Sequence, residues 1–233
     1  MKYLSIPTIT KSLHRIYEDK TYEHRTGTPA SGLLQHYFPI NKYITTPEQI
    51  QDISRKKPDF TVERLENEKL VPHLFVEIKS LVNSNFNDIM DQLHDTILHT
   101  VDNHGLSGGS FSVFIIAMKG TKIAFFEFHS FVSLLDEYNI ANYKGFIPLG
   151  YNIPASEFFS INSKATLIDY LQHISKVDVP SKVEVLKALG VEYTSKIKHP
   201  HIWDLLNKDH SDYVHNLFQT MANSTAGKDI AEE

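Results

Sequence analysis

The sequence predicts an α/β domain, with a central mixed β-sheet flanked by helices. Two segments, 59–65 and 73–79, alternate apolar and polar residues around a short polar connection, which is typical of a β-hairpin. Residues 85–101 carry apolar side chains at helical spacing, and residues 110–118 form an apolar run typical of a central strand. This order of elements is typical of a layered α/β or α+β domain.

The composition is that of a folded protein with a core of its own. The chain has 233 residues, of which 41% are hydrophobic and 22% are charged. It has no cysteine, which excludes a disulfide scaffold, a thiol nucleophile and every cysteine-based metal site. No apolar run approaches the ~20 residues of a membrane span, and the first residues lack the pattern of a signal peptide. We therefore expect a soluble, intracellular protein without membrane contact.

Charge is distributed unevenly along the chain. The formal net charge of -5 argues against a purely electrostatic nucleic-acid binder. Residues 1–60 nevertheless hold nine basic and six acidic side chains, a net of +3. For the domain organisation we expect a core over 1–129, a mostly helical C-terminal extension over 130–222 packed on that core, and a flexible tail over 223–233.

The remaining elements follow from periodicity and from turn residues. A helix is predicted over 10–25, a turn over 26–31, and a β-prone segment over 33–44. Thr46 and Pro47 are the expected cap and first residue of a short helix through Ile53. Further elements are predicted as a strand over 122–128 and helices over 130–138, 164–176, 181–189 and 202–221.

The hairpin carries the residues best suited to chemistry. Asp59 begins its first strand, and Glu77 and Lys79 lie two apart on the second, so they project from the same face. Pairing of the strands can bring Asp59 close to Glu77, and two carboxylates form a hard-oxygen site suited to Mg²⁺ or Mn²⁺. The Ile78 carbonyl can add a ligand, and Lys79 can hold or deprotonate an attacking water. This is the equipment of metal-assisted phosphodiester hydrolysis.

The arrangement resembles the PD-(D/E)xK nuclease superfamily. The matching residues are Pro58-Asp59 and, after an intervening 17 residues, Glu77-Ile78-Lys79; the resemblance covers residues 10–129. It implies a restriction endonuclease-like fold and a metal-dependent nuclease, endonucleolytic and with DNA favoured over RNA as the substrate. Asp59 and Glu77 would be the metal ligands and Lys79 the catalytic lysine. A homodimer would place two such sites for a double-strand cut, as in many restriction enzymes.

Other residues could complete such a site. Many members of the superfamily add an acidic residue from the preceding helix, and Glu18 and Glu23 have equal claims here. Some place a glutamine on the following helix, where Gln92 stands. Contacts to the nucleic-acid backbone are expected from basic residues near the site, namely Lys20, Arg55, Lys56 and Lys57.

Two other functions fit the same sequence. The domain could be a nuclease-like module that binds nucleic acid without catalysis, because fold does not fix function. It could also be a protein-interaction domain with the C-terminal helices as its contact surface. The intact set of Asp59, Glu77 and Lys79 favours the enzyme.

Overall fold

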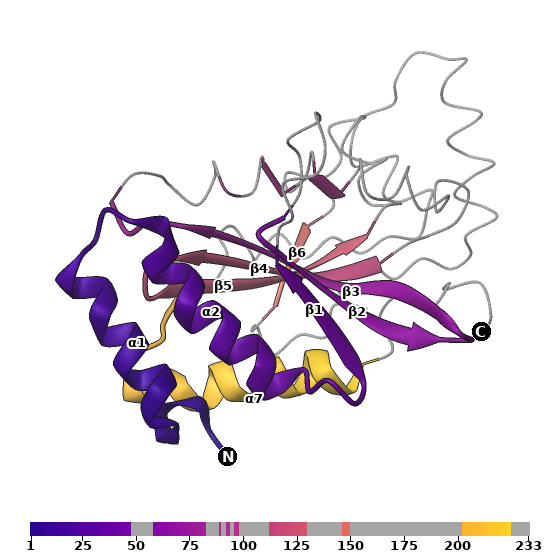
Figure 1. Ribbon diagram of the computed structural model, residues 1–233, viewed down its shortest axis with the longest axis horizontal. Helices are drawn as coiled ribbons and strands as arrows, with labels where there is room; N and C mark the ends of the chain where they lie inside the picture. The colour runs from indigo at the N-terminus through magenta and orange to yellow at the C-terminus, as the bar shows by residue number, and fades with distance from the viewer. Residues whose placement is uncertain are drawn as a thin grey trace, which may run out of the picture.

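The computed structural model confirms the α/β class, with a mixed open sheet and helices packed against it. It describes residues 1–47, 58–82, 112–129, 146–149 and 202–224, together with Ile89, Gln92, Leu93, Thr96 and Ile97. Within these residues β1 to β6 lie in chain order across the sheet, and β7 pairs with β5 (Figure 1). The strands are β1 Tyr43–Pro47, β2 Phe60–Glu66, β3 Lys69–Lys79, β4 Ser112–Lys119, β5 Lys122–His129, β6 Phe146–Pro148 and β7 Trp203–Asp204.

The three α-helices that lie wholly within the described residues are on one side of this sheet (Figure 1). They are α1 Pro7–Glu18, α2 Glu23–Tyr37 and α7 Ser211–Asn223, and short 3₁₀ turns η1 Tyr3–Ser5 and η4 Lys208–His210 precede α1 and α7. Apolar residues of all three helices share one core with the facing side of the sheet. None of the described helices combines the length and apolarity needed to cross a membrane.

The sheet is mixed because one neighbouring pair of strands is parallel. β2 and β3 form the predicted antiparallel hairpin, closed by Asn67 and Glu68, whose positive φ angles of 47° and 67° suit a type I′ turn. β3 and β4 are parallel, with Lys79 opposite Lys119, so the chain must cross over between them. Between 83 and 111 the described residues, Ile89, Gln92, Leu93, Thr96 and Ile97, are all helical, in agreement with the helix predicted over 85–101.

Side chains along β3 and β4 alternate between two apolar layers. On one face, Val76 and Ile116 belong to the core shared with α1, α2 and α7. On the other face, Phe75 packs in a second cluster with apolar residues of the crossover helix, including Leu93. Glu77 follows Phe75 by two residues, so it projects toward this second face. The predicted acid therefore lies on the side of the sheet that the crossover helix covers.

Two helices stand where the sequence predicts one helix over 10–25 and a turn over 26–31. The chain leaves α1 after Glu18, and the Asp19 carboxylate accepts hydrogen bonds from both the backbone N–H and the hydroxyl of Thr21. Such local bonds compete with the helix and favour a break. The predicted turn over 26–31 is wrong, because these residues lie inside α2.

The glycines of α2 allow close packing. A Cβ atom at Gly32 would lie 3.2 Å from Ile9 of α1, and one at Gly27 would lie 3.1 Å from Ile78 of β3. The residues that suggested a turn therefore bring α2 close to α1 and to the carboxyl end of β3.

The prediction is also wrong around β1. The segment 33–44 was expected to be extended, but α2 continues to Tyr37 and the strand begins only at Tyr43. Thr46 and Pro47 end β1 instead of opening a helix. β1 lies at the edge of the sheet, where a proline without an N–H group is tolerated.

The helix predicted over 202–221 begins only at Ser211. Before it, the Asp204 carboxylate accepts from the Leu206 N–H at 3.1 Å, and the Asn207 side chain accepts from the Asp209 N–H at 2.9 Å. These bonds hold a short strand and a 3₁₀ turn in place of the first helical turns. Other predicted elements lie outside the described residues, namely the helix after Pro47 and those over 130–138, 164–176 and 181–189.

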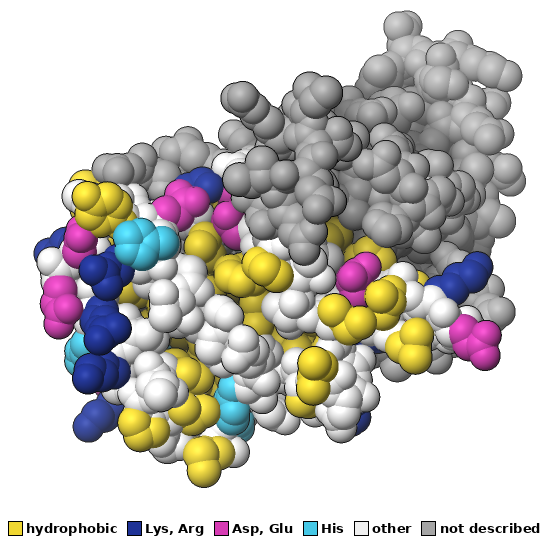
Figure 2. Space-filling model, in the orientation of Figure 1, with side chains coloured by type: hydrophobic (Ala, Val, Ile, Leu, Met, Phe, Trp, Pro, Cys, Tyr) yellow, Lys and Arg dark blue, Asp and Glu magenta, His cyan; other side chains and the backbone are white. Residues whose placement is uncertain are grey.

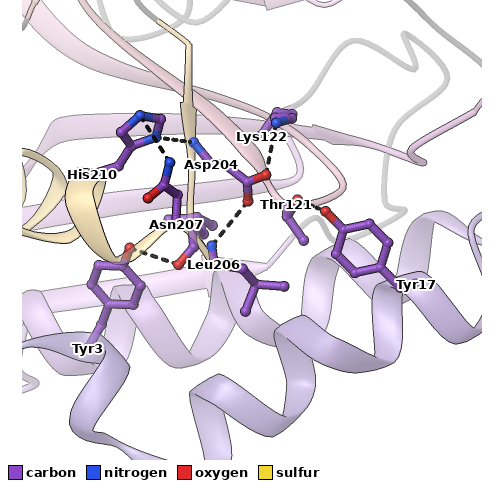
Figure 3. A network of polar contacts seen from close by, with 9 residues as sticks. Tyr3, Tyr17, Thr121, Lys122, Asp204, Leu206, Asn207 and His210 are labelled. Carbon is purple, nitrogen blue, oxygen red and sulfur yellow. Dashed lines mark hydrogen bonds and ion pairs between the residues drawn. The ribbon is translucent and has the colours of Figure 1, made fainter.

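Polar contacts join the described C-terminal segment to the rest of the domain (Figure 3). The Lys122 ammonium lies 2.8 Å from the Asp204 carboxylate, next to the turn between β4 and β5. The buried Tyr3 hydroxyl donates to the Leu205 carbonyl at 2.9 Å. Residues 202–224 thus supply β7 to the sheet and α7 to the helical layer.

Gly120, in the turn between β4 and β5, should tolerate no side chain. Its φ of +58° is unfavourable for other residues, and an added Cβ would lie 2.7 Å from Leu81. We expect Gly120→Ala to lower the free energy of unfolding by about 1–3 kcal/mol, measured by urea denaturation. Combining it with Leu81→Ala should relieve the clash but leave the backbone strain. A Gly120→Ala protein as stable as the wild type would contradict this description of the turn.

Candidate active site

Glu77 and Lys79 meet at the carboxyl end of β3, on the face predicted from their spacing. The Lys79 ammonium donates to Glu77 Oε1 at 2.6 Å. Asp59, which immediately precedes β2, accepts a hydrogen bond from the Ile78 N–H at 2.6 Å through Oδ2. The structure therefore brings the three residues of the predicted motif to one place.

The surroundings of the Glu77 carboxylate disfavour its ionised form. Its side chain is 0% exposed, and its Oε2 atom has no hydrogen-bond partner among the described residues. Burial and, next, the negative charge of Asp59 raise the pKa of Glu77 to about 7 from its ordinary 4.5, although Lys79 acts in the opposite direction. A buried carboxylate with one unpartnered oxygen needs either a proton or a further cation.

Lys79 is the positive centre of the cluster. Its side chain is 19% exposed, and burial alone would lower its pKa. The hydrogen bond and charge of Glu77, together with the charges of Asp59 and Glu23, outweigh burial and raise the pKa of Lys79. The lysine therefore stays an ammonium group in this arrangement, which suits a hydrogen-bond donor and a stabiliser of negative charge.

Ile78 supplies backbone groups on the side of Asp59. Within a strand the N–H and C=O groups of one residue point toward the same neighbour. The Ile78 N–H points to Asp59, so its carbonyl oxygen faces the same side of β3. This is the placement expected of the carbonyl ligand suggested by the sequence.

The structure distinguishes between the two helix glutamates. Glu23 is the first residue of α2, and its Oε2 lies 3.8 Å from the Lys79 ammonium. Thr26, one turn later, donates its hydroxyl to the Lys79 carbonyl at 3.1 Å and so ties α2 to β3. Glu18 is exposed at the end of α1, and the structure records no contact between it and Lys79. Glu23 is thus the helix glutamate that joins the cluster.

The other predicted binding residues are placed less closely. Lys20 is exposed after α1, with its ammonium 5.8 Å from the centre of the Tyr17 ring. Gln92 is exposed on the crossover helix, and the structure records no contact between it and the carboxylates. The basic residues Arg55, Lys56 and Lys57 lie outside the described residues.

Lys119 is a further cation that the sequence did not suggest. It ends β4 and pairs with Lys79 across the parallel strands, so both side chains project from the same face. The side chain is half-buried, and none of the ion pairs of the described residues includes it. Only the register of β3 against β4 reveals this position, since 39 residues separate the two lysines along the chain.

Neither a preformed metal group among the described residues nor a related protein identifies the chemistry of this cluster. Within the described part of the chain, no three His, Asp or Glu side chains already form a metal-binding group. Comparisons with protein-family models, with characterised proteins and with solved structures found no match. The proposal that follows therefore depends on the chemistry of the cluster itself.

The raised pKa of Glu77 predicts how stability depends on pH in metal-free protein. A carboxyl group with a higher pKa in the folded state binds its proton more tightly there, so stability falls as pH rises from about 4.5 to about 7. Between pH 5 and 7.5 the wild type should lose on the order of 2 kcal/mol that Glu77→Gln does not lose. Urea denaturation in EDTA measures both proteins. Parallel pH profiles for the two would refute the prediction.

Proposed function

We propose that the protein is a metal-dependent nuclease that hydrolyses phosphodiester bonds at the Glu77 cluster. The observation that carries the proposal is the buried Glu77 carboxylate, one oxygen of which has no partner among the described residues, beside Asp59 and the Lys79 ammonium. A buried carboxylate of this kind lowers the stability of the fold, and residues with such strongly shifted pKa values cluster at functional sites. The resemblance of these residues to the PD-(D/E)xK motif supports the same reaction class.

The residues present fit a hard divalent cation. Asp59 and Glu77 supply carboxylate oxygens, the Ile78 carbonyl lies on the Asp59 side, and Glu77 Oε2 lacks a partner among the described residues. Mg²⁺ and Mn²⁺ prefer this donor set. When bound, such an ion would act as a Lewis acid on the phosphate and would lower the pKa of a bound water.

The protein's own residues supply orientation and charge. The Lys79 ammonium can donate to the attacking water or to a phosphate oxygen and can stabilise the negative charge that develops there. Glu23, 3.8 Å away, attracts this ammonium toward α2. Lys119, on the same face, is placed to contact a neighbouring phosphate. Ionised Glu77 is required for metal binding, so at subsaturating metal concentrations activity should fall as the pH drops below about 7.

Hydrolysis assays with matched variants test the proposal. Labelled single-stranded and duplex DNA and RNA are incubated with the protein in Mg²⁺, in Mn²⁺ and in EDTA. We expect metal-dependent cleavage by the wild type and its loss in Asp59→Asn and Glu77→Gln. Glu63→Gln, which removes a half-buried carboxylate from the middle of β2, is the control and should remain active. No cleavage of any substrate, or equal cleavage by all variants, would refute the proposal.

A further inference from the structure

Exposed aromatic rings gather where α1 passes into α2, beside the Glu77 cluster. Tyr17 and Tyr22 are 45% and 57% exposed, and His24 is also exposed. Single exposed apolar residues are common on protein surfaces, but here three rings stand within eight residues of chain. Lys20 lies between them, and we call the set of Tyr17, Lys20, Tyr22 and His24 the corner surface.

Short contacts connect the corner surface to the elements that carry the proposed site. Tyr22 directly precedes Glu23, which lies 3.8 Å from the Lys79 ammonium. The Tyr17 hydroxyl lies 3.2 Å from the Thr121 hydroxyl. Thr121 follows Gly120, whose N–H donates to the Lys79 carbonyl at 3.1 Å. Tyr17 is therefore held close to the end of β3, and Tyr22 is the chain neighbour of the glutamate that faces Lys79.

The chemistry of the corner surface is that of a stacking platform with a cation. The rings of Tyr22 and His24 lie 5.4 Å apart and are tilted by 37°, so they are neighbours without covering each other. The Lys20 ammonium lies 5.8 Å from the Tyr17 ring centre. Rings that stack on bases, next to cations that contact the backbone, are the two components of sites for single-stranded nucleic acid. Figure 2 shows further Lys and Arg side chains following one another along the α1 side of the molecule.

We propose that the corner surface binds unpaired bases of a single-stranded polynucleotide and directs that strand to the Glu77 cluster. The choice of nucleic acid as the partner rests on the proposed function. Stacking on a side chain requires a free base face, which a duplex does not offer along its length. The site is also recessed, since Glu77 is 0% and Lys79 19% exposed. An unpaired strand reaches such a position more readily than a duplex does.

Binding measurements in EDTA test this inference without hydrolysis. Fluorescence anisotropy compares a labelled oligothymidylate of about 12 nucleotides with an abasic strand, an oligouridylate and a duplex of equal length. For the wild type we expect the thymidylate to bind at least roughly tenfold more tightly than the abasic strand and the duplex, because stacking contributes substantially to each bound base. Comparison of the thymidylate with the uridylate shows whether DNA or RNA is preferred.

Matched variants locate the contact. Tyr22→Ala and Tyr17→Ala should each weaken thymidylate binding roughly tenfold and leave abasic binding unchanged. Tyr213→Ala removes an exposed tyrosine from α7 and should change neither thymidylate binding nor abasic binding. Lys20→Ala should weaken binding more than Lys69→Ala, which removes the same charge from the exposed turn end of the β2–β3 hairpin.

The outcomes separate this inference from the proposed function. Equal wild-type affinity for thymidylate and abasic strands, or for single strands and duplex, would overturn the inference even if the protein cleaves duplex with Mg²⁺. Both comparisons use the wild-type protein alone, so they do not depend on whether a variant folds. Preferential single-strand binding without cleavage would refute the nuclease proposal and leave the corner surface established.

Discussion

Lys79→Met is expected to lower metal-dependent hydrolysis by about 10²- to 10⁴-fold, with the fold retained. The methionine has a similar length but no charge, so it cannot donate to the attacking water or stabilise negative charge at the phosphate. The Tm of the Lys79→Met protein should stay close to that of the wild type, because the Lys79 side chain is partly exposed and Glu77 can take up a proton. Initial rates at saturating substrate measure the effect on kcat.

Lys69→Met is the matched control for this variant. Lys69 is exposed at the opposite end of β3, so its removal takes the same charge from the same strand without touching the cluster. Its kcat should remain that of the wild type. If Lys79→Met and Lys69→Met are equally active, Lys79 has no part in the chemistry.

Phe218→Ala is expected to cause the largest loss of stability, about 3–5 kcal/mol. Phe218 is 1% exposed on α7 and stacks on Tyr37 of α2, with the ring centres 4.4 Å apart. It also meets the Phe125 ring edge-on at 5.1 Å. Truncation removes these contacts and leaves a cavity between α7, α2 and the sheet. Urea or thermal denaturation measures the loss.

Tyr213→Ala serves as the control on the same helix. This side chain is exposed, so its removal should change stability by less than about 0.5 kcal/mol. A loss for Phe218→Ala no larger than that of the control would show that α7 is not packed on the domain as described.

The parts of the fold that depend on local pattern could be predicted from the sequence. The hairpin of β2 and β3 follows from alternation around a polar turn, and β4 follows from an apolar run. The meeting of Glu77 and Lys79 is also local, because residues two apart on a strand always share a face. Asp59 joins them through the register of one hairpin.

The parts that depend on tertiary packing could not be predicted. In the sequence Gly27 is typical of a turn, but in the structure its lack of a Cβ atom allows α2 to pack closely against Ile78. The break after α1 places Glu23 beside Lys79. The sequence predicts one continuous helix over 10–25, and on such a helix Glu18 and Glu23 cannot be distinguished. Lys119 required the register of a parallel pair whose strands are distant in sequence.

Titration with Mn²⁺ tests the central claim most directly, because it measures the cation site at Asp59 and Glu77 without a substrate. Electron paramagnetic resonance of free Mn²⁺ at pH 8 gives the number of bound ions in the wild type, Glu77→Gln, Asp59→Asn and Glu63→Gln. We expect the wild type and Glu63→Gln to bind equally, and the other two variants to lose at least one ion or to bind it far more weakly. Identical binding curves for all four proteins would contradict a metal site at the end of β3.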